Sequence, residues 1–138
     1  MTKPLATPLL AALLLLPLAV AASPLDDQLA RYAAAAKAGD PGFAGFSAAR
    51  GKTLHTQAFA LGKPDTPACT SCHGPDTRGA GKTPAGKTIE PVALSATPGR
   101  YADPAKVEKW FKRNCNEVLG RECTPREKGD WLTFMAGQ

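Results

Sequence analysis

Histidine and cysteine are scarce in this chain: of its 138 residues, two are histidines and four are cysteines. A zinc site built on Cys69 and Cys72 would have to draw its further ligands from His55, Cys115 and Cys123. Runs of valine, isoleucine and aromatic residues, from which strands are built, are missing around the two cysteines. Their absence argues against the βαβ setting of a thioredoxin-like redox pair.

The chain also lacks a hydrophobic run long enough for a comfortable transmembrane helix. Its longest apolar stretch, Leu9–Val20, is short and contains Pro17. A lysine precedes this stretch and an Ala-Val-Ala sequence ends it, as in a secretory signal peptide. We therefore expect a cleaved signal peptide over residues 1–21 and export to the periplasm, with an uncleaved anchor as the alternative.

The chain also lacks a strong net charge. The formal charge of +5 at pH 7 is too small to indicate a nucleic-acid-binding protein. It is compatible with docking on an acidic redox partner, and equally with an ordinary solvated surface. The mature segment, residues 22–138, has the length of one domain.

What the chain does contain is Cys69-Thr70-Ser71-Cys72-His73, a C-x-x-C-H pentapeptide. Two cysteines at this spacing reach the two vinyl groups on one edge of a porphyrin, while the adjacent imidazole binds the iron. The motif predicts one haem c, attached covalently through Cys69 and Cys72, with His73 as an iron ligand. A zinc or redox dithiol is the alternative for the C-x-x-C pair taken alone.

A second motif, Gly81–Thr88, matches the phosphate-binding P-loop pattern G-x-x-x-x-G-K-[ST]. That loop works between a strand and a helix, whose N-terminus faces the phosphate. Here a haem motif precedes it and Ile89-Glu90-Pro91 follows, so we reject nucleotide binding. Lys82, Lys87 and Arg100 are instead candidates for neutralising a haem propionate.

Helical patterns flank a long loop, Gly74–Asp103, that is rich in glycine, proline and threonine. Capping residues and apolar spacing predict helices over residues 26–37, 47–60, 103–119 and 124–135. The loop has no helical period, and it can wrap a haem that supplies its apolar contacts. We expect a mostly α fold with its first helix packed outside the haem core.

The third predicted helix carries an asparagine on its apolar side. At about 100° per residue, an apolar stripe on this helix consists of Val107, Trp110, Phe111 and Val118. Asn114 falls in the middle of this stripe, whereas Asn116 lies on the opposite face. Burying an amide without a partner costs roughly 1 to 3 kcal/mol, so Asn114 needs either the iron or a backbone carbonyl.

Other residues are also candidates for the iron ligand opposite His73. Met135 lies near the chain end on a helix whose apolar side is needed for packing. His55 precedes the haem motif on a helix expected beside the haem edge, although such a histidine is more often at the surface or hydrogen-bonded within the core. A lysine is a further candidate, and the residue pattern alone leaves the choice open.

The segments Lys106–Asn116 and Val118–Thr124 resemble the sphaeroides haem protein family of oxygen-binding monohaem cytochromes c. They are also similar to the related cytochromes c″, which carry histidine where this chain has Asn114. The likeness extends from Gly51-Lys52 through the haem motif and the Gly86–Pro91 loop to the last two cysteines.

The resemblance implies a class I cytochrome c-like fold and a disulfide between Cys115 and Cys123. It also implies that Asn114 binds the ferric iron and leaves it on reduction. An amide oxygen is a hard, weak donor that suits Fe(III) better than Fe(II), so this behaviour is chemically reasonable. O₂, CO or NO would then bind at the opened position, where the displaced amide can donate a hydrogen bond.

We therefore expect a periplasmic electron-transfer cytochrome that binds a diatomic gas. Members of the family look like terminal acceptors fed by a dihaem cytochrome c and a membrane cytochrome b, and some oxidise nitric oxide with bound oxygen. The sequence itself assigns no enzymatic turnover. The main alternative is a plain electron carrier with a closed six-coordinate haem, and a redox-regulated gas sensor is a third class.

Overall fold

The computed structural model describes residues 22–138, so the predicted signal peptide, residues 1–21, lies outside the described residues. The elements in chain order are α1 (Pro24–Gly39), α2 (Ala48–Thr56), α3 (Thr70–His73), β1 (Gly81–Lys82), β2 (Thr88–Ile89), α4 (Pro104–Leu119) and α5 (Pro125–Ala136). The expected mostly α fold is confirmed. Within residues 22–138 no helix has the length and apolarity needed to cross a membrane.

Local capping residues explain where the helices begin. Thr124 accepts a hydrogen bond from the backbone N–H of Glu127, whose carboxylate bonds back to the Thr124 N–H. Asp103 caps α4 in a similar way by accepting from two backbone N–H groups of the first turn. Each of these helices continues with a proline, whose missing N–H is not needed there. The predicted starts of the third and fourth helices are thus confirmed.

One helix end and one stretch of the long loop differ from the sequence prediction. α2 ends at Thr56 and not near Ala60, because the chain turns away and the Phe59 N–H donates to the Pro67 carbonyl over 2.7 Å. The long loop contains a two-residue antiparallel ladder, in which Gly81 pairs with Ile89. The P-loop-like segment is therefore a hairpin, and the next helix after it is α4.

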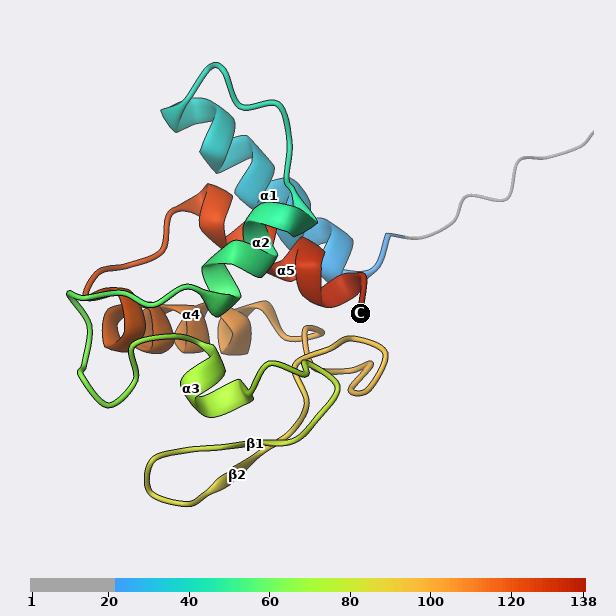
Figure 1. The fold of residues 1–138 in the computed structure, drawn as a ribbon. Coiled ribbons are helices and arrows are strands. Elements are labelled where there is room, and N and C mark those ends of the chain that lie inside the picture. Colours follow the sequence, from blue (N-terminus) through green and yellow to red (C-terminus); the bar gives the residue numbers. More distant parts are fainter. Residues whose placement is uncertain (1–21) are drawn as a thin grey trace, which may run out of the picture.

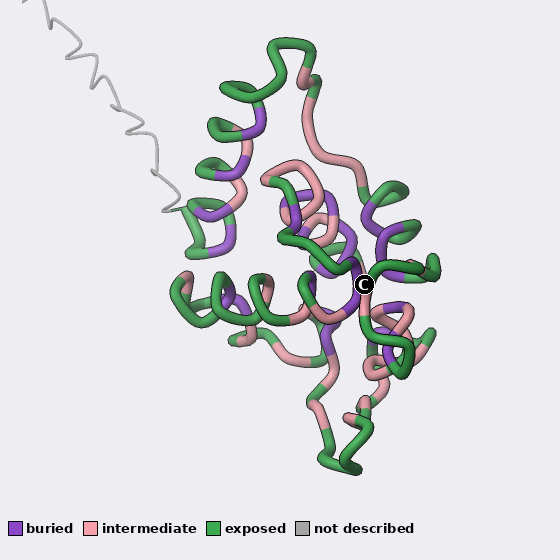
Figure 2. The backbone as a smooth tube through the Cα atoms, turned by 90° about the vertical axis from the view of Figure 1, so that its left-hand side faces the viewer, coloured by how far each residue is buried: buried purple, intermediate pink, exposed green. Residues whose placement is uncertain are grey.

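α1 and the hairpin lie at opposite ends of the molecule (Figure 1). α2 and α1 both pack on α5, while α4 runs below them and α3 lies beneath α4, next to the hairpin. Figure 2 shows buried positions along the inner sides of the helices, whereas the tip of the hairpin is exposed. The haem motif thus lies between the helical body and the hairpin.

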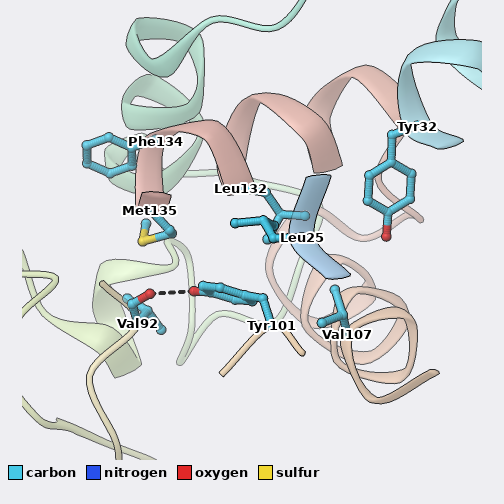
Figure 3. Packing of buried hydrophobic residues seen from close by; sticks show 8 residues of the cluster. All are labelled: Leu25, Tyr32, Val92, Tyr101, Val107, Leu132, Phe134 and Met135. Atoms are coloured by element: carbon cyan, nitrogen blue, oxygen red, sulfur yellow. Dashed lines mark hydrogen bonds between the residues drawn. The ribbon is translucent and has the colours of Figure 1, made fainter. Parts of the chain in front are cut away.

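One core cluster joins α1, α4, α5 and the end of the long loop (Figure 3). Its buried members are Leu25, Tyr32, Val92, Tyr101, Val107, Leu132, Phe134 and Met135. The Tyr101 hydroxyl donates to the Val92 carbonyl, and the Gln28 amide donates to the Tyr101 carbonyl over 2.7 Å. Met135 is fully buried in this cluster, so its side chain serves the packing of α5.

The contact between α2 and α5 is fixed by a buried carboxylate. Asp130 of α5 accepts from the Ser47 backbone N–H at 2.6 Å and from the Arg50 guanidinium at 2.7 and 2.8 Å. The carboxylate raises the pKa of the Arg50 guanidinium through this hydrogen bond. Gly51 lies at the same crossing, where a Cβ atom would stand 2.0 Å from the Asp130 carbonyl oxygen. Glycine therefore allows α2 to approach the backbone of α5 closely.

Candidate haem site

The C-x-x-C-H motif folds into one helical turn, α3. The His73 N–H donates to the Cys69 carbonyl over 3.0 Å, and the Gly74 N–H donates to the Thr70 carbonyl over 2.9 Å. Gly74 then leaves the helix with φ of +69°. Because residues three apart lie on one side of a helical turn, Cys69 and Cys72 present their thiols together, and His73 follows directly.

The hairpin packs directly on the backbone of this motif. A Cβ atom on Gly81 would lie 2.2 Å from the Cys72 carbonyl oxygen and 3.0 Å from the Cα atom of His73. Only glycine permits this approach. The β1 strand therefore restrains the position of the His73 backbone.

The two thiols have different surroundings. Cys69 packs against the cluster of Leu54, Cys115, Val118, Leu119 and Cys123, with its Sγ atom 3.8 Å from the Leu54 carbonyl oxygen. Burial raises the pKa of the Cys69 thiol to about 11. Burial and the nearby Glu117 carboxylate also raise the pKa of the Cys72 thiol. Neither cysteine takes part in a disulfide, so both are available for covalent attachment of a haem.

His73 is prepared to act as a neutral ligand. Burial lowers the pKa of its imidazole to about 4, helped by the positive charge of Arg100 and by His55. The ring is therefore uncharged at neutral pH and keeps a nitrogen lone pair for a metal. Within residues 22–138 its ring nitrogens make no hydrogen bond.

His55, a sequence candidate for the sixth ligand, is engaged on both ring nitrogens. The Trp131 indole N–H donates to its Nδ1 atom over 3.3 Å, and its Nε2 atom lies 3.4 Å from the Gly74 carbonyl oxygen. Since Nδ1 accepts, Nε2 carries the proton and donates to Gly74. Burial lowers the pKa of the ring, which favours this neutral form. His55 thus lies beside His73, with 6.4 Å between the ring centroids.

Asn114 lies on a flank of α4 that faces the haem motif. Trp110, Asn114 and Glu117 fall within about 60° of one another around the helix. Val118, one helical turn after Asn114, belongs to the cluster against which Cys69 packs, so this flank of α4 borders α3. Asn114 is half-buried, and within the described chain its amide has no hydrogen-bond partner. Asn116, by contrast, is exposed and donates to the Lys112 carbonyl over 2.6 Å.

Trp110 differs from the sequence prediction. It is 43% exposed, although the apolar stripe placed it with the interior residues of the third helix. The buried side of α4 is formed by Val107, Cys115, Val118 and Leu119, which leaves Trp110 at its edge beside Asn114. An exposed indole next to an unpaired amide is what a flat apolar group lying against this flank would cover.

The donor set fits a haem c. Two free thiols and an unpaired neutral imidazole lie on α3, and an unpaired amide with an exposed tryptophan lies on the neighbouring flank of α4. Residues 22–138 hold no group of three histidine, cysteine, aspartate or glutamate side chains placed for a metal ion. The zinc alternative for Cys69 and Cys72 therefore lacks its further ligands.

Cys115, the neighbour of Asn114, forms a disulfide with Cys123 that joins the end of α4 to the start of α5 across a separation of eight residues. Loop-closure entropy gives such a bond a stabilisation of about 2.5 kcal/mol. We predict that Cys115→Ser with Cys123→Ser lowers the free energy of unfolding by about this amount, measured by urea denaturation.

The reducing agent dithiothreitol supplies the control for the disulfide prediction. It should destabilise the unmodified protein to the same degree and leave the double variant unchanged. Two alkylatable thiols at these positions in the native, oxidised protein would contradict the pairing.

The sequence did not reveal the hydrogen bonds that Trp131 and Gly74 make to His55. Trp131 and His55 are 76 positions apart, and no spacing rule joins them. Their only sequence signal was that a histidine and a tryptophan both occurred on helices expected to be partly buried. Sequence reasoning accordingly weighed His55 as a ligand, whereas its ring is occupied by protein partners.

Comparison with known proteins identifies relatives over most of the described chain. A family model with the description "Domain of unknown function (DUF1924)" matches residues 41–135. The cytochrome c-type protein SHP of Cereibacter sphaeroides is 56% identical over 91 residues, which cover 66% of this chain and 70% of SHP. Cytochrome c″ of Methylophilus methylotrophus is 31% identical over 106 residues, or 76% of this chain and 74% of that protein.

Solved structures of the same two proteins match the fold. The structure of oxidised SHP, described as an oxygen-binding cytochrome c, aligns with a TM-score of 0.77 and 49% identity, covering 84% of this chain and 98% of SHP. The solution structure of cytochrome c″, which addresses haem-ligand detachment, aligns with a TM-score of 0.71 and 29% identity. That alignment covers 83% of this chain and 93% of cytochrome c″.

Proposed function

This chain belongs to the DUF1924 family and to the family of cytochrome c-type proteins that includes SHP, and from that premise we propose that it is a redox-switched, gas-binding electron carrier. The predicted family and its covalent haem c are confirmed by these relatives. In the proposal Cys69 and Cys72 hold the haem, His73 is the permanent iron ligand, and Asn114 binds the ferric iron and leaves on reduction.

The unpaired amide of Asn114 carries this proposal. It is half-buried on the flank of α4 that borders α3, and no protein group in residues 22–138 satisfies it. A ligand on that flank would give the amide a partner that the described protein does not provide. No hydrogen bond from the described residues holds the Asn114 side chain, which suits a ligand that must also leave.

Haem iron supplies the redox change and, in its ferrous form, an affinity for O₂, CO and NO. The residues of the chain decide which ligand the iron keeps in each oxidation state. The neutral imidazole of His73 suits both oxidation states, whereas the hard amide oxygen of Asn114 favours the ferric state. Once displaced, the same amide stays beside the opened position on α4, where its N–H groups can donate to a gas molecule.

The two relatives support each half of the proposal. SHP is described as an oxygen-binding cytochrome c, and it is 56% identical to this chain over the matched residues. Cytochrome c″ has been studied for haem-ligand detachment. Similarity to both relatives supports a ligand that detaches from the iron and a position that a gas molecule then fills.

An absorption spectrum of the reduced protein, recorded with and without CO, tests the proposal. We expect a high-spin ferrous haem that binds CO rapidly. A reduced haem that stays low-spin and binds CO only slowly would instead indicate a plain electron carrier with a closed six-coordinate site.

Haem attachment has its own test. We predict that acid-acetone extraction leaves the haem on the polypeptide, because thioether bonds are covalent and axial coordination is not. The double variant Cys69→Ala with Cys72→Ala should release its haem into the organic phase, whereas Cys69→Ala alone should retain it through Cys72. Free haem extracted from the unmodified protein would refute the covalent site.

We also propose a cellular location and electron donors for the protein. Residues 1–21 are proposed to be a cleaved signal peptide, and residues 22–138 a periplasmic monohaem domain. By family resemblance its electron donors are a dihaem cytochrome c and a membrane cytochrome b. Sequencing the N-terminus of the purified holoprotein tests the cleavage site, since an intact Met1 would contradict export by signal cleavage.

A further inference from the structure

We propose that His55 and Trp131 are positioning residues for the iron ligand His73. They hold His73 in place, so that only the ligand on the opposite side of the iron leaves on reduction. This inference rests on the proposed function, because it concerns the same haem. Its subject is a chain of contacts that runs from α5 through α2 to the residue next to His73.

The chain of contacts consists of two hydrogen bonds through one buried ring. The Trp131 indole donates to Nδ1 of His55, and Nε2 of His55 donates to the carbonyl of Gly74. His55 is fully buried, so water does not compete for either bond. An indole N–H can only donate, which fixes the His55 tautomer that is able to donate to Gly74.

Gly74 is the residue at which this contact matters. Its carbonyl adjoins the α3 turn, and its positive φ makes it the point where the chain turns away from His73. This carbonyl belongs to the peptide unit between Gly74 and Pro75, so holding it restrains the chain directly after the ligand residue. The His55 ring itself lies alongside the His73 ring, which limits rotation of His73 toward α2.

The ring of His55 is in turn held by aromatic packing. Trp131 makes edge contacts with Tyr101 and Phe111, with ring centroids 6.1 and 5.7 Å apart, and Phe134 lies 6.0 Å from His55. These residues belong to the core cluster or pack against it. The position of His73 is therefore coupled to the rigid core of the protein.

Asn114 has no comparable support. Its amide makes no hydrogen bond within residues 22–138, while the backbone around His73 is held by α3, by the hairpin at Gly81 and by His55. When reduction weakens axial coordination, we expect Asn114, which the protein does not hold by a hydrogen bond, to move away from the iron while His73 stays. Outer-shell partners of this kind are known to tune ligand binding substantially.

The test replaces His55 and Trp131 in the haem-loaded protein. We expect His55→Leu to shift the ferrous iron–histidine stretching band to lower frequency and to broaden it, and to raise the midpoint potential, because a loosened imidazole is a weaker donor. His55→Gln keeps a side-chain N–H for Gly74 and should restore much of both values. Trp131→Phe removes the indole donor but keeps an aromatic ring at this position, and it should give a smaller shift in the same direction.

A destabilised control separates positioning from general loss of stability. Leu25→Ala empties a buried site on α1 in the same core cluster, so it should lower stability without moving the band or the potential. The positioning role is overturned if His55→Leu leaves both values unchanged, if His55→Gln does not rescue them, or if Leu25→Ala produces the same shift. If His55→Leu fails to fold, the stretching band and the midpoint potential of His55→Gln and Trp131→Phe still test the positioning role.

The same measurements distinguish failure of this inference from failure of the proposed function. Recording the stretching band in an Asn114→Ala background removes any dependence on release of the amide. If reduction does not open the site, the reduced unmodified protein will bind CO only slowly. The midpoint potentials of the His55 variants then still decide whether His55 positions His73.

Discussion

Replacing Asn114 by alanine is expected to convert the oxidised haem from a six-coordinate form to a five-coordinate or water-bound one. Alanine offers no donor atom, and no other side chain on the same flank of α4 provides a hard oxygen ligand except the Glu117 carboxylate, which is already paired with Lys63 and Arg113. The change should appear as a loss of the low-spin ferric absorption spectrum.

Asn116→Ala is the matched control, since Asn116 is two positions along the same helix but exposed and bonded to the Lys112 carbonyl. Its ferric spectrum should equal that of the unmodified protein. The Asn114→Ala protein should still bind CO when reduced. It should lose the hydrogen bond that the amide gives to O₂, so oxygen should dissociate faster or oxidise the iron sooner.

The outcome that rejects the switch is equally specific. Asn114→Ala would keep the ferric spectrum of the unmodified protein, while Met135→Ala or His55→Ala abolished it. Met135 is buried in the core and His55 is hydrogen-bonded on both nitrogens, so either result would require a rearranged structure. The protein would then be an ordinary electron carrier.

Gly51→Ala is expected to lower the free energy of unfolding by about 3 kcal/mol, at the upper end of the usual cost of overpacking. The added Cβ atom would stand 2.0 Å from the Asp130 carbonyl oxygen and 2.8 Å from the Phe134 Cβ atom. Both are backbone or near-backbone atoms on α5, so α2 must move. Urea denaturation of the holoprotein measures the loss.

This displacement should also reach the haem, because α2 carries His55 four residues after Gly51. Moving α2 away from α5 lengthens the bond between Trp131 and His55, so the iron–histidine band should shift in the same direction as in His55→Leu. Gly39→Ala is the control, since a Cβ atom there would meet no atom within 4 Å. Equal stabilities for the two alanine variants would show that the α2–α5 crossing tolerates a wider spacing.

The parts of the fold that were predictable depend on local chemistry. Asp103 and Thr124 each lie directly before a proline, and Thr124 is also followed by Glu127 in a capping box, so a short window of sequence defines where α4 and α5 begin. The haem motif is equally local, because its five residues carry their own spacing. The contrast between Asn114 and Asn116 also followed from helical period alone, since it needs only one helix.

What could not be predicted depends on distant partners. The Gly51 contact exists only because Asp130 lies across it, and the role of His55 depends on Trp131 and Gly74. Trp110 was assigned to the interior because the period of α4 shows which residues are apolar but not which neighbour covers each of them. The haem motif was predictable, but the residues on other elements that lie around it were not.

The pairing of α2 with α5 has a consequence for how quickly the chain folds. Its central hydrogen bond joins Ser47 to Asp130, which are 83 positions apart, so forming it closes a loop that contains the haem motif, the hairpin and α4. The entropy lost on closing such a loop must be met before the contact forms, and the short Cys115–Cys123 bridge barely reduces it. A haem fastened at residues 69–73 gives this long loop an apolar nucleus on which to collapse. The cofactor should therefore accelerate folding, and the chain without it should fold slowly, whatever its final stability.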